Sequence, residues 1–187
     1  MKINNLLYFL LFAALMTTYS CSTDDEPEIK VPNVDMMGDD DDDNDENDLG
    51  DAPTFSIMTT NEETIVSEDF EDRNLVIFFF GYNCPPCKAV GPSIESKLYQ
   101  KFKDKENFAM IGADQWEGND AGVNSFQNTT GITFPLGVKG AKMAKDFGTT
   151  YDRLVVVNRA GKIVYKGNSI ATNNLDEVIE IVTGLLE

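Results

Sequence analysis

The apolar run LVIFFF at residues 75–80 is the feature that most constrains the fold of this chain. It has the length of a strand and contains leucine, β-branched and aromatic side chains with no polar interruption. Such runs are typical of strands buried on both faces, as in the centre of a parallel sheet. From Cys84 to Lys103 the apolar spacing becomes helical. The positions that recur every four residues are Val90, Ile94, Leu98 and Phe102.

The segments after residue 53 alternate between strand and helix patterns, which predicts an α/β domain with a mixed sheet. Further strands are expected near residues 53–58, 63–66, 108–114, 132–138, 154–158 and 162–167. Further helices are expected near residues 118–131, 141–148 and 173–186. The last two strands form a predicted hairpin around Gly161, and Asn174 is predicted to cap the final helix.

Two cysteines, Cys84 and Cys87, lie where the central strand passes into its helix. The free N–H groups and the dipole at a helix start favour a thiolate, which is the nucleophile of disulfide exchange. Cys84 is therefore predicted to attack and Cys87 to resolve the mixed disulfide. A structural disulfide remains an alternative, although so small a loop constrains little of the unfolded chain. A metal site is disfavoured, since zinc usually takes four ligands and the chain has three cysteines and no histidine.

The first 52 residues have a different character. An apolar run after one lysine fits a secretory signal over residues 1–20, and Cys21 after Ser20 fits the lipidated cysteine of a bacterial lipoprotein. Residues 21–52 are rich in aspartate and predict a disordered acidic tether. Fourteen acidic residues and one lysine in residues 22–52 account for most of the net charge of −17. Residues 53–187 are then the globular domain.

The globular part resembles the thioredoxin fold, and most closely the TlpA/ResA-like branch of exported, membrane-anchored thiol-disulfide oxidoreductases. The resemblance covers residues 52–187 and rests on APTFSI, NLVIFFFGYNCPPCKAVGP, FAMIGAD, GITFPLGVKGAKMAKDFG and LVVVNRAGKIVYKG. It implies a central mixed sheet flanked by helices, with the helix-strand insertion of that branch. It also implies a redox-active disulfide between Cys84 and Cys87. Pro92 stands where thioredoxins carry a helix-kinking proline.

Several residues around the cysteines are expected to line the site, and some depart from the family pattern. The expected lining residues are Tyr82, Asn83, Pro85, Pro86, Lys88, Pro92 and Asp152. Asn83 replaces the aromatic residue that usually precedes the first cysteine. Asp152 stands where the family carries a cis-proline, which implies altered substrate docking. Asp152 is either an acid or base near the cysteines or an exposed loop residue.

These observations predict a membrane-anchored thiol-disulfide oxidoreductase that acts on protein thiols and disulfides of the cell envelope, with no metal or other cofactor. The family resemblance implies reduction as the direction and an unidentified electron donor. The expected location is the outer membrane, on its periplasmic face or at the cell surface. One alternative is a surface lipoprotein that uses the scaffold for binding and keeps a non-catalytic disulfide. A thiol peroxidase is disfavoured, because Gly81 stands where such enzymes need threonine. The absence of a basic face excludes nucleic acid as an expected partner.

Overall fold

The computed structural model describes residues 49–187, and the predicted signal, Cys21 and most of the acidic tract lie outside that range. The described chain forms a seven-stranded mixed sheet in the order β2-β1-β5-β4-β3-β6-β7. The strands are β1 (Ser56–Thr59), β2 (Thr64–Val66), β3 (Asn74–Phe80), β4 (Phe108–Asp114), β5 (Leu136–Val138), β6 (Arg153–Val157) and β7 (Ile163–Lys166). Strands β3, β4 and β5 run parallel, and the other pairings are antiparallel. The predicted α/β class and mixed sheet are confirmed.

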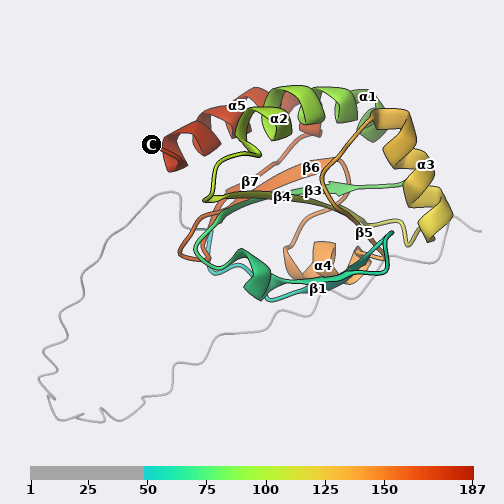
Figure 1. Cartoon of the computed structure of the whole chain (residues 1–187), viewed down its shortest axis with the longest axis horizontal. Coiled ribbons are helices and arrows are strands. Elements are labelled where there is room, and N and C mark those ends of the chain that lie inside the picture. The colour runs from blue at the N-terminus through green and yellow to red at the C-terminus, as the bar shows by residue number, and fades with distance from the viewer. Residues whose placement is uncertain (1–48) are drawn as a thin grey trace, which may run out of the picture. The chain divides into compact units, whose positions relative to one another are not determined.

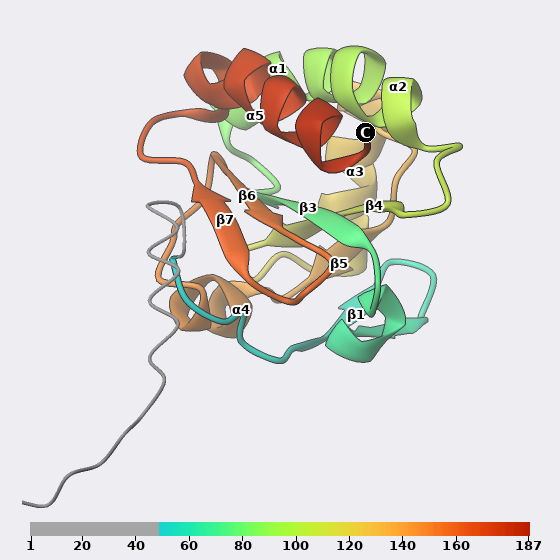
Figure 2. The same ribbon diagram turned by 90° about the vertical axis from the view of Figure 1, so that its left-hand side faces the viewer.

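Helices cover both faces of the sheet. The helices are η1 (a 3-10 helix, Ser67–Phe70), α1 (Pro85–Ser93), η2 (a π-helix, Ile94–Tyr99), α2 (Gln100–Phe102), α3 (Asp120–Thr130), α4 (Ala141–Asp146) and α5 (Ala171–Leu185). Helices α1, α2 and α5 lie on one side of the sheet and α4 lies on the other (Figure 1). The view turned by 90° shows the same two layers (Figure 2). No helix within residues 49–187 has the length and apolar character needed to cross a bilayer.

Strand β3 is the centre of the core, as its apolar run predicts. All seven of its residues are buried. Because side chains alternate across a strand, Val76, Phe78 and Phe80 join the core under α1, α3 and α5. Leu75, Ile77 and Phe79 join the second core under α4. The strand therefore holds both layers together and fixes where the helix after it begins.

The helix predicted over residues 84–103 is present, but its middle is not α-helical. It begins at Pro85 and passes into the π-helix at Ile94 before the last α-helical turn. Pro92 lies inside α1 and has no N–H for the intrahelical bond four residues back. The change of helix type follows Pro92 by two residues, so the helix is irregular just beyond the proline.

The predicted cap of the final helix is wrong. Helix α5 begins at Ala171, and Asn174 lies inside its first turn rather than before it. Asn174 is buried, and its Oδ1 accepts a hydrogen bond from the Ser169 N–H. The N–H of Ala171 donates instead to Oδ1 of Asp152, at 3.3 Å. A residue distant in sequence thus caps the helix start, which a local pattern does not reveal.

The ordered pairing starts upstream of Pro53. The Leu49 N–H donates to the Ile163 carbonyl, and the Ile163 N–H donates to the Gly50 carbonyl. The Ala52 N–H donates to the Gly161 carbonyl. Residues 49–52, which the sequence places in the tether, therefore lie along the start of β7.

Candidate redox site

The disulfide lies where the sequence places it, between the end of β3 and the start of α1. Cys84 is the residue directly before α1, and Cys87 is in its first turn. The two form a disulfide with a Cα–Cα distance of 5.3 Å. Both residues have no exposed surface and pack with the core under α1. The predicted pair is thus joined in a small loop at a helix start.

The backbone of α1 directs one N–H group at Cys84. Pro85 and Pro86 occupy the first two helical positions and have no N–H. The Cys87 N–H is therefore the first one available, and it lies 3.2 Å from Sγ of Cys84. In the reduced protein this donor and the positive end of the helix dipole would stabilise a Cys84 thiolate.

The other predicted lining residues differ in how exposed they are. Asn83, Pro85 and Pro86 are exposed around Cys84, and Tyr82 is half-buried. Nζ of Lys88 donates to Oδ1 of Asn83 at 2.9 Å, so this cation is held beside the residue that precedes the first cysteine. Pro92 is exposed, one and a half turns further along the helix.

Asp152 is buried, so its interpretation as an exposed loop residue is wrong. It is 1% exposed, its φ is 57°, and it directly precedes β6. No peptide bond among residues 49–187 is cis. A proline cannot adopt a positive φ, so the family's proline is incompatible with this backbone. Asparagine and aspartate tolerate the left-handed conformation better than other non-glycine residues.

The Asp152 carboxyl has few hydrogen bonds to offset its burial. Its Oδ1 accepts from Ala171, whereas its Oδ2 is buried without a hydrogen-bond partner. Burial raises the pKa of this carboxyl above its ordinary value, against the opposing effects of the Ala171 N–H and Arg153. Asp152 thus links the start of β6 to the start of α5, and this link leaves an acidic group buried away from water.

Asp114, at the end of β4, is a site residue that the sequence reading missed. Its Oδ1 accepts from the N–H groups of Tyr82 and Trp116, and its Oδ2 accepts from Gly118. Burial raises its pKa although these three N–H groups oppose the shift. A Cβ at Gly118 would lie 2.7 Å from this carboxylate and from the Tyr82 ring. Asp114 therefore joins the loop before Cys84 to the loop after β4.

The available signal for Asp114 was its place in the chain. Strands β3 and β4 are parallel and end at the same edge of the sheet. Polar residues that follow such strand ends commonly meet at a site. An acid closing the otherwise apolar run FAMIGAD fits that rule.

Gln115 connects a third loop to this edge. Its N–H donates to the Phe80 carbonyl at 2.7 Å. Its Oε1 accepts from the Thr150 hydroxyl at 3.1 Å and from the Tyr151 N–H at 2.6 Å. The loop before β6 is thus tied to the ends of β3 and β4, on the edge that carries Cys84.

The described residues contain no cluster of three or more His, Cys, Asp or Glu side chains that could hold a metal ion. Cys84 and Cys87 supply at most two thiolates, and Cys21 lies outside the described range. The chemistry that these residues support is thiol-disulfide exchange.

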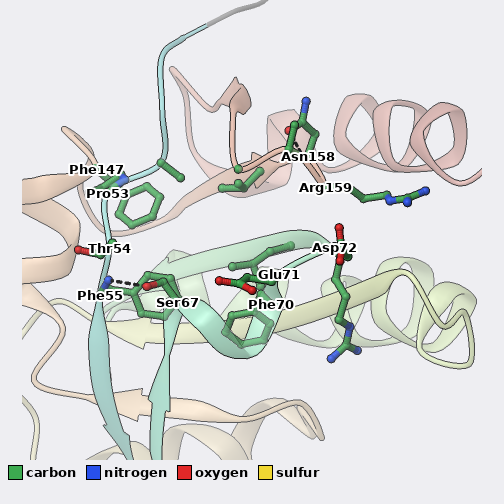
Figure 3. Close-up of a pocket in the computed structure, with 16 residues that line it drawn as sticks. Pro53, Thr54, Phe55, Ser67, Phe70, Glu71, Asp72, Phe147, Asn158 and Arg159 are labelled. Atoms are coloured by element: carbon green, nitrogen blue, oxygen red, sulfur yellow. Dashed lines mark hydrogen bonds between the residues drawn. The ribbon is translucent and has the colours of Figure 1, made fainter.

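A cavity of about 340 Å³ lies away from the cysteines. Its lining comes from the segment before β1, from η1 and from the turn between β6 and β7 (Figure 3). Leu75, near the start of β3, also lines it. Cys84 follows the other end of this strand, roughly 20 Å away at the rise of a β-strand. The cavity is therefore separate from the disulfide.

Comparison with known proteins agrees with this geometry. The Redoxin family model matches residues 48–180. The thiol-disulfide oxidoreductase ResA of Bacillus subtilis is 27% identical over 119 residues, which cover 61% of this chain and 63% of that protein. The thioredoxin-like protein YneN of the same organism is 27% identical over 105 residues, covering 54% of this chain and 61% of its own length. The chain thus spans about three-fifths of the length of these two relatives.

A solved structure supports the fold. A provisionally named protein disulfide isomerase from Bacteroides thetaiotaomicron superposes with a TM-score of 0.67 and 26% identity. The match covers 73% of this chain and 87% of that one. The fold is thioredoxin-like, with the mixed sheet flanked by helices that the sequence predicts.

Proposed function

Because the chain belongs to the Redoxin family, we propose that it is a thiol-disulfide oxidoreductase that exchanges disulfides with proteins of the cell envelope. The observation that carries this proposal is the Cys84–Cys87 disulfide at the start of α1. The relatives named thiol-disulfide oxidoreductases and the matched Redoxin domain support the same chemistry. The Cys-Pro-Pro-Cys pair is the reactive group in this proposal.

The reaction follows from the positions of the two sulfurs. In the reduced protein, the Cys84 thiolate attacks one sulfur of a substrate disulfide, forms a mixed disulfide and releases the other substrate sulfur as a thiolate. The Cys87 thiolate then attacks Sγ of Cys84, releases the second substrate thiolate and forms the Cys84–Cys87 disulfide. The substrate gains two electrons and the protein loses two. A dithiol donor restores the reduced pair, and reduction of substrates is the proposed direction.

The anchor is a separate proposal that rests on the sequence alone. Cys21, after the apolar run and Ser20, is proposed to carry a lipid that holds the domain at the outer membrane, with the acidic residues 22–52 as a spacer. Replacing Cys21 with serine should move the protein from the membrane fraction to the soluble fraction. Mass spectrometry of the mature N-terminus would identify the lipid, and an unmodified Cys21 would contradict the anchor.

The first test of the exchange proposal is the redox equilibrium of the pair. The full chain is equilibrated in glutathione or dithiothreitol buffers and then alkylated. Mass spectrometry of the peptide that contains both cysteines gives the fraction that is reduced. A potential near −270 mV would match a thioredoxin-like reductant, and one near −120 mV would match an oxidant. A pair that stays oxidised in strong reductant would overturn the exchange proposal and favour the binding-module alternative.

Trapping assigns the roles of the two sulfurs. A Cys87→Ser variant should accumulate a mixed disulfide with a model protein substrate, because the resolving thiol is gone. A Cys84→Ser variant should accumulate none. Equal trapping by both variants would contradict Cys84 as the attacking residue.

A further inference from the structure

Two exposed aromatic side chains come from loops that meet next to the loop before Cys84. Trp116 and Tyr151 are each 39% exposed. The rings of Trp116 and Tyr151 meet edge to face, with centroids 5.0 Å apart. Single exposed apolar residues need no explanation, but a gathered group marks a contact surface.

This surface is joined to the residues that position Cys84. A Cβ at Gly81 would lie 2.5 Å from the Trp116 ring, so the indole covers the backbone of Gly81. The Gly81 carbonyl accepts the Cys84 N–H at 2.9 Å. The aromatic pair therefore adjoins the loop from which the attacking cysteine is presented.

The two rings are also held in place. Gln115 accepts from the Tyr151 N–H, and Asp114 accepts from the Trp116 N–H. Because the Tyr151 N–H is already bonded within the chain, this loop does not offer that group to a passing peptide. Its aromatic faces are what it presents.

We propose that Trp116 and Tyr151 form a recognition surface for an aromatic or large aliphatic side chain adjacent to the reacting cysteine of a substrate polypeptide. This inference rests on the proposed function. The occupant follows from continuity with the exchange site, because a disulfide with no exposed surface is reached only by a segment that settles closely over the neighbouring loops. A polypeptide whose cysteine approaches Cys84 brings its adjacent side chains over this surface, and apolar ones are stabilised there by burial.

Two model peptides test the inference. Both carry one cysteine as a mixed disulfide with thionitrobenzoate; one has phenylalanine beside that cysteine and the other has glycine there. The reduced full chain is mixed with each peptide, and the released coloured thiolate gives the rate. Cys84 and Cys87 become a disulfide while the peptide and thionitrobenzoate each leave as a thiol, so the electrons balance.

The measured quantity is the ratio of the second-order rate constant for the phenylalanine peptide to that for the glycine peptide. The unmodified chain should prefer the phenylalanine peptide by about tenfold, on the scale of a well-formed aromatic contact. Trp116→Ala and Tyr151→Ala should bring the ratio close to one, and Trp116→Phe should keep most of it. Met58→Ala is the matched control, because Met58 is an exposed apolar residue on β1 and is 52% exposed.

The remaining outcomes separate the inference from the proposed function. Equal rates with both peptides in the unmodified chain would overturn the inference and leave the oxidoreductase intact. If the ratio stays the same in Trp116→Ala, the inference is also overturned. Both rates would then fall together through a structural effect, or rise together because the ring only covers the disulfide. Failure of both peptides to oxidise the Cys84–Cys87 pair would instead contradict the proposed function.

Discussion

At the scale of single residues, two buried carboxyls, one at the end of β4 and one directly before β6, differ in how their oxygens are bonded. Asp114 accepts three backbone N–H groups, whereas Asp152 accepts one and leaves an oxygen without a partner. Burial raises the pKa of both. The first carboxyl is expected to stabilise the site through its hydrogen bonds, and the second to impose a cost that depends on pH.

We expect Asp152→Asn to flatten the dependence of stability on pH. The folded-state pKa of Asp152 is raised above its unfolded value of about 3.9, so the folded state binds more protons between the two values. Stability attributable to this group is therefore fully present below the unfolded pKa and is lost as pH rises through the folded pKa. Asparagine keeps an oxygen for the Ala171 N–H and carries no charge, so that loss should disappear. Urea unfolding from pH 4 to pH 8 measures it.

Exposed Asp176 in α5 provides the control for this variant. Asp176→Asn should leave the slope of the unfolding free energy against pH unchanged. A slope that Asp152→Asn does not change would contradict the raised pKa. Asp152→Pro should instead destabilise the domain by about 3 kcal/mol or more, because the proline ring cannot adopt the observed φ of 57°.

Asp114→Asn should destabilise the protein and slow disulfide exchange. An amide has one acceptor oxygen, so either the Gly118 N–H or the pair from Tyr82 and Trp116 would face an NH₂ group. A buried N–H left without its acceptor costs about 1–3 kcal/mol. Urea unfolding at pH 7 and the exchange rate of the reduced pair measure both effects. Asp104→Asn, which removes only an exposed ion pair with Lys103, should change the unfolding free energy by less than about 1 kcal/mol.

Sequence reasoning identified the cysteine pair because its chemistry is encoded locally, by spacing and by the helix that follows. It missed Asp114 and Gln115, whose partners lie 32 to 36 residues away in sequence. It placed Asp152 at the family's proline position but left its environment open. Burial and the left-handed backbone of Asp152 depend on the packing of β6 against α5, which no local pattern specifies.

At the scale of elements, contact between α1 and α3 constrains the helix that carries the cysteines. A Cβ at Gly91 would lie 2.7 Å from Cγ2 and 2.8 Å from Cβ of Thr130. Gly91→Ala should therefore destabilise the domain by about 1–3 kcal/mol through overpacking, despite alanine's higher helix propensity. It should also shift the Cys84–Cys87 potential if the start of α1 moves.

Gly184→Ala is the matched control, since Gly184 lies in α5 and a Cβ there would meet nothing within 4 Å. It should stabilise the protein by about 0.5–1 kcal/mol. The comparison uses urea unfolding of both variants. A stabilised Gly91→Ala protein would mean that α1 and α3 separate without cost.

Most elements were predictable from the sequence, for an identifiable reason. Strands β3 and β4 are continuous apolar runs, and the hairpin of β6 and β7 contains Gly161 with φ 76°, so the local pattern and the fold agree. The π-helical turns after Pro92 and the start of α5 at Ala171 were not predictable. The start of α5 depends on the carboxyl of Asp152, which lies 19 residues away in sequence and which a local pattern does not reveal.

At the scale of the whole molecule, the boundary between the acidic tract and the domain lies upstream of where composition places it. Composition changes at Pro53, but residues 49–52 make three backbone hydrogen bonds with Gly161 and Ile163. Nζ of Lys162 also lies 2.9 Å from the Asp51 carboxylate. This segment covers part of β7, which is otherwise an edge of the sheet.

A chain that begins at residue 53 should accordingly be less stable than one that begins at residue 49. Three backbone hydrogen bonds at about 1 kcal/mol each predict a loss of about 2–3 kcal/mol, with little from the exposed ion pair. The shorter chain should also associate more readily, because its bared β7 edge can pair with another copy. Urea unfolding and sedimentation of the two truncated chains, each beside the full chain, measure these effects. The chain from residue 49 keeps all three bonds and should match the full chain in unfolding free energy. Equal stability of both truncated chains would contradict a structural role for residues 49–52 and return the boundary to Pro53.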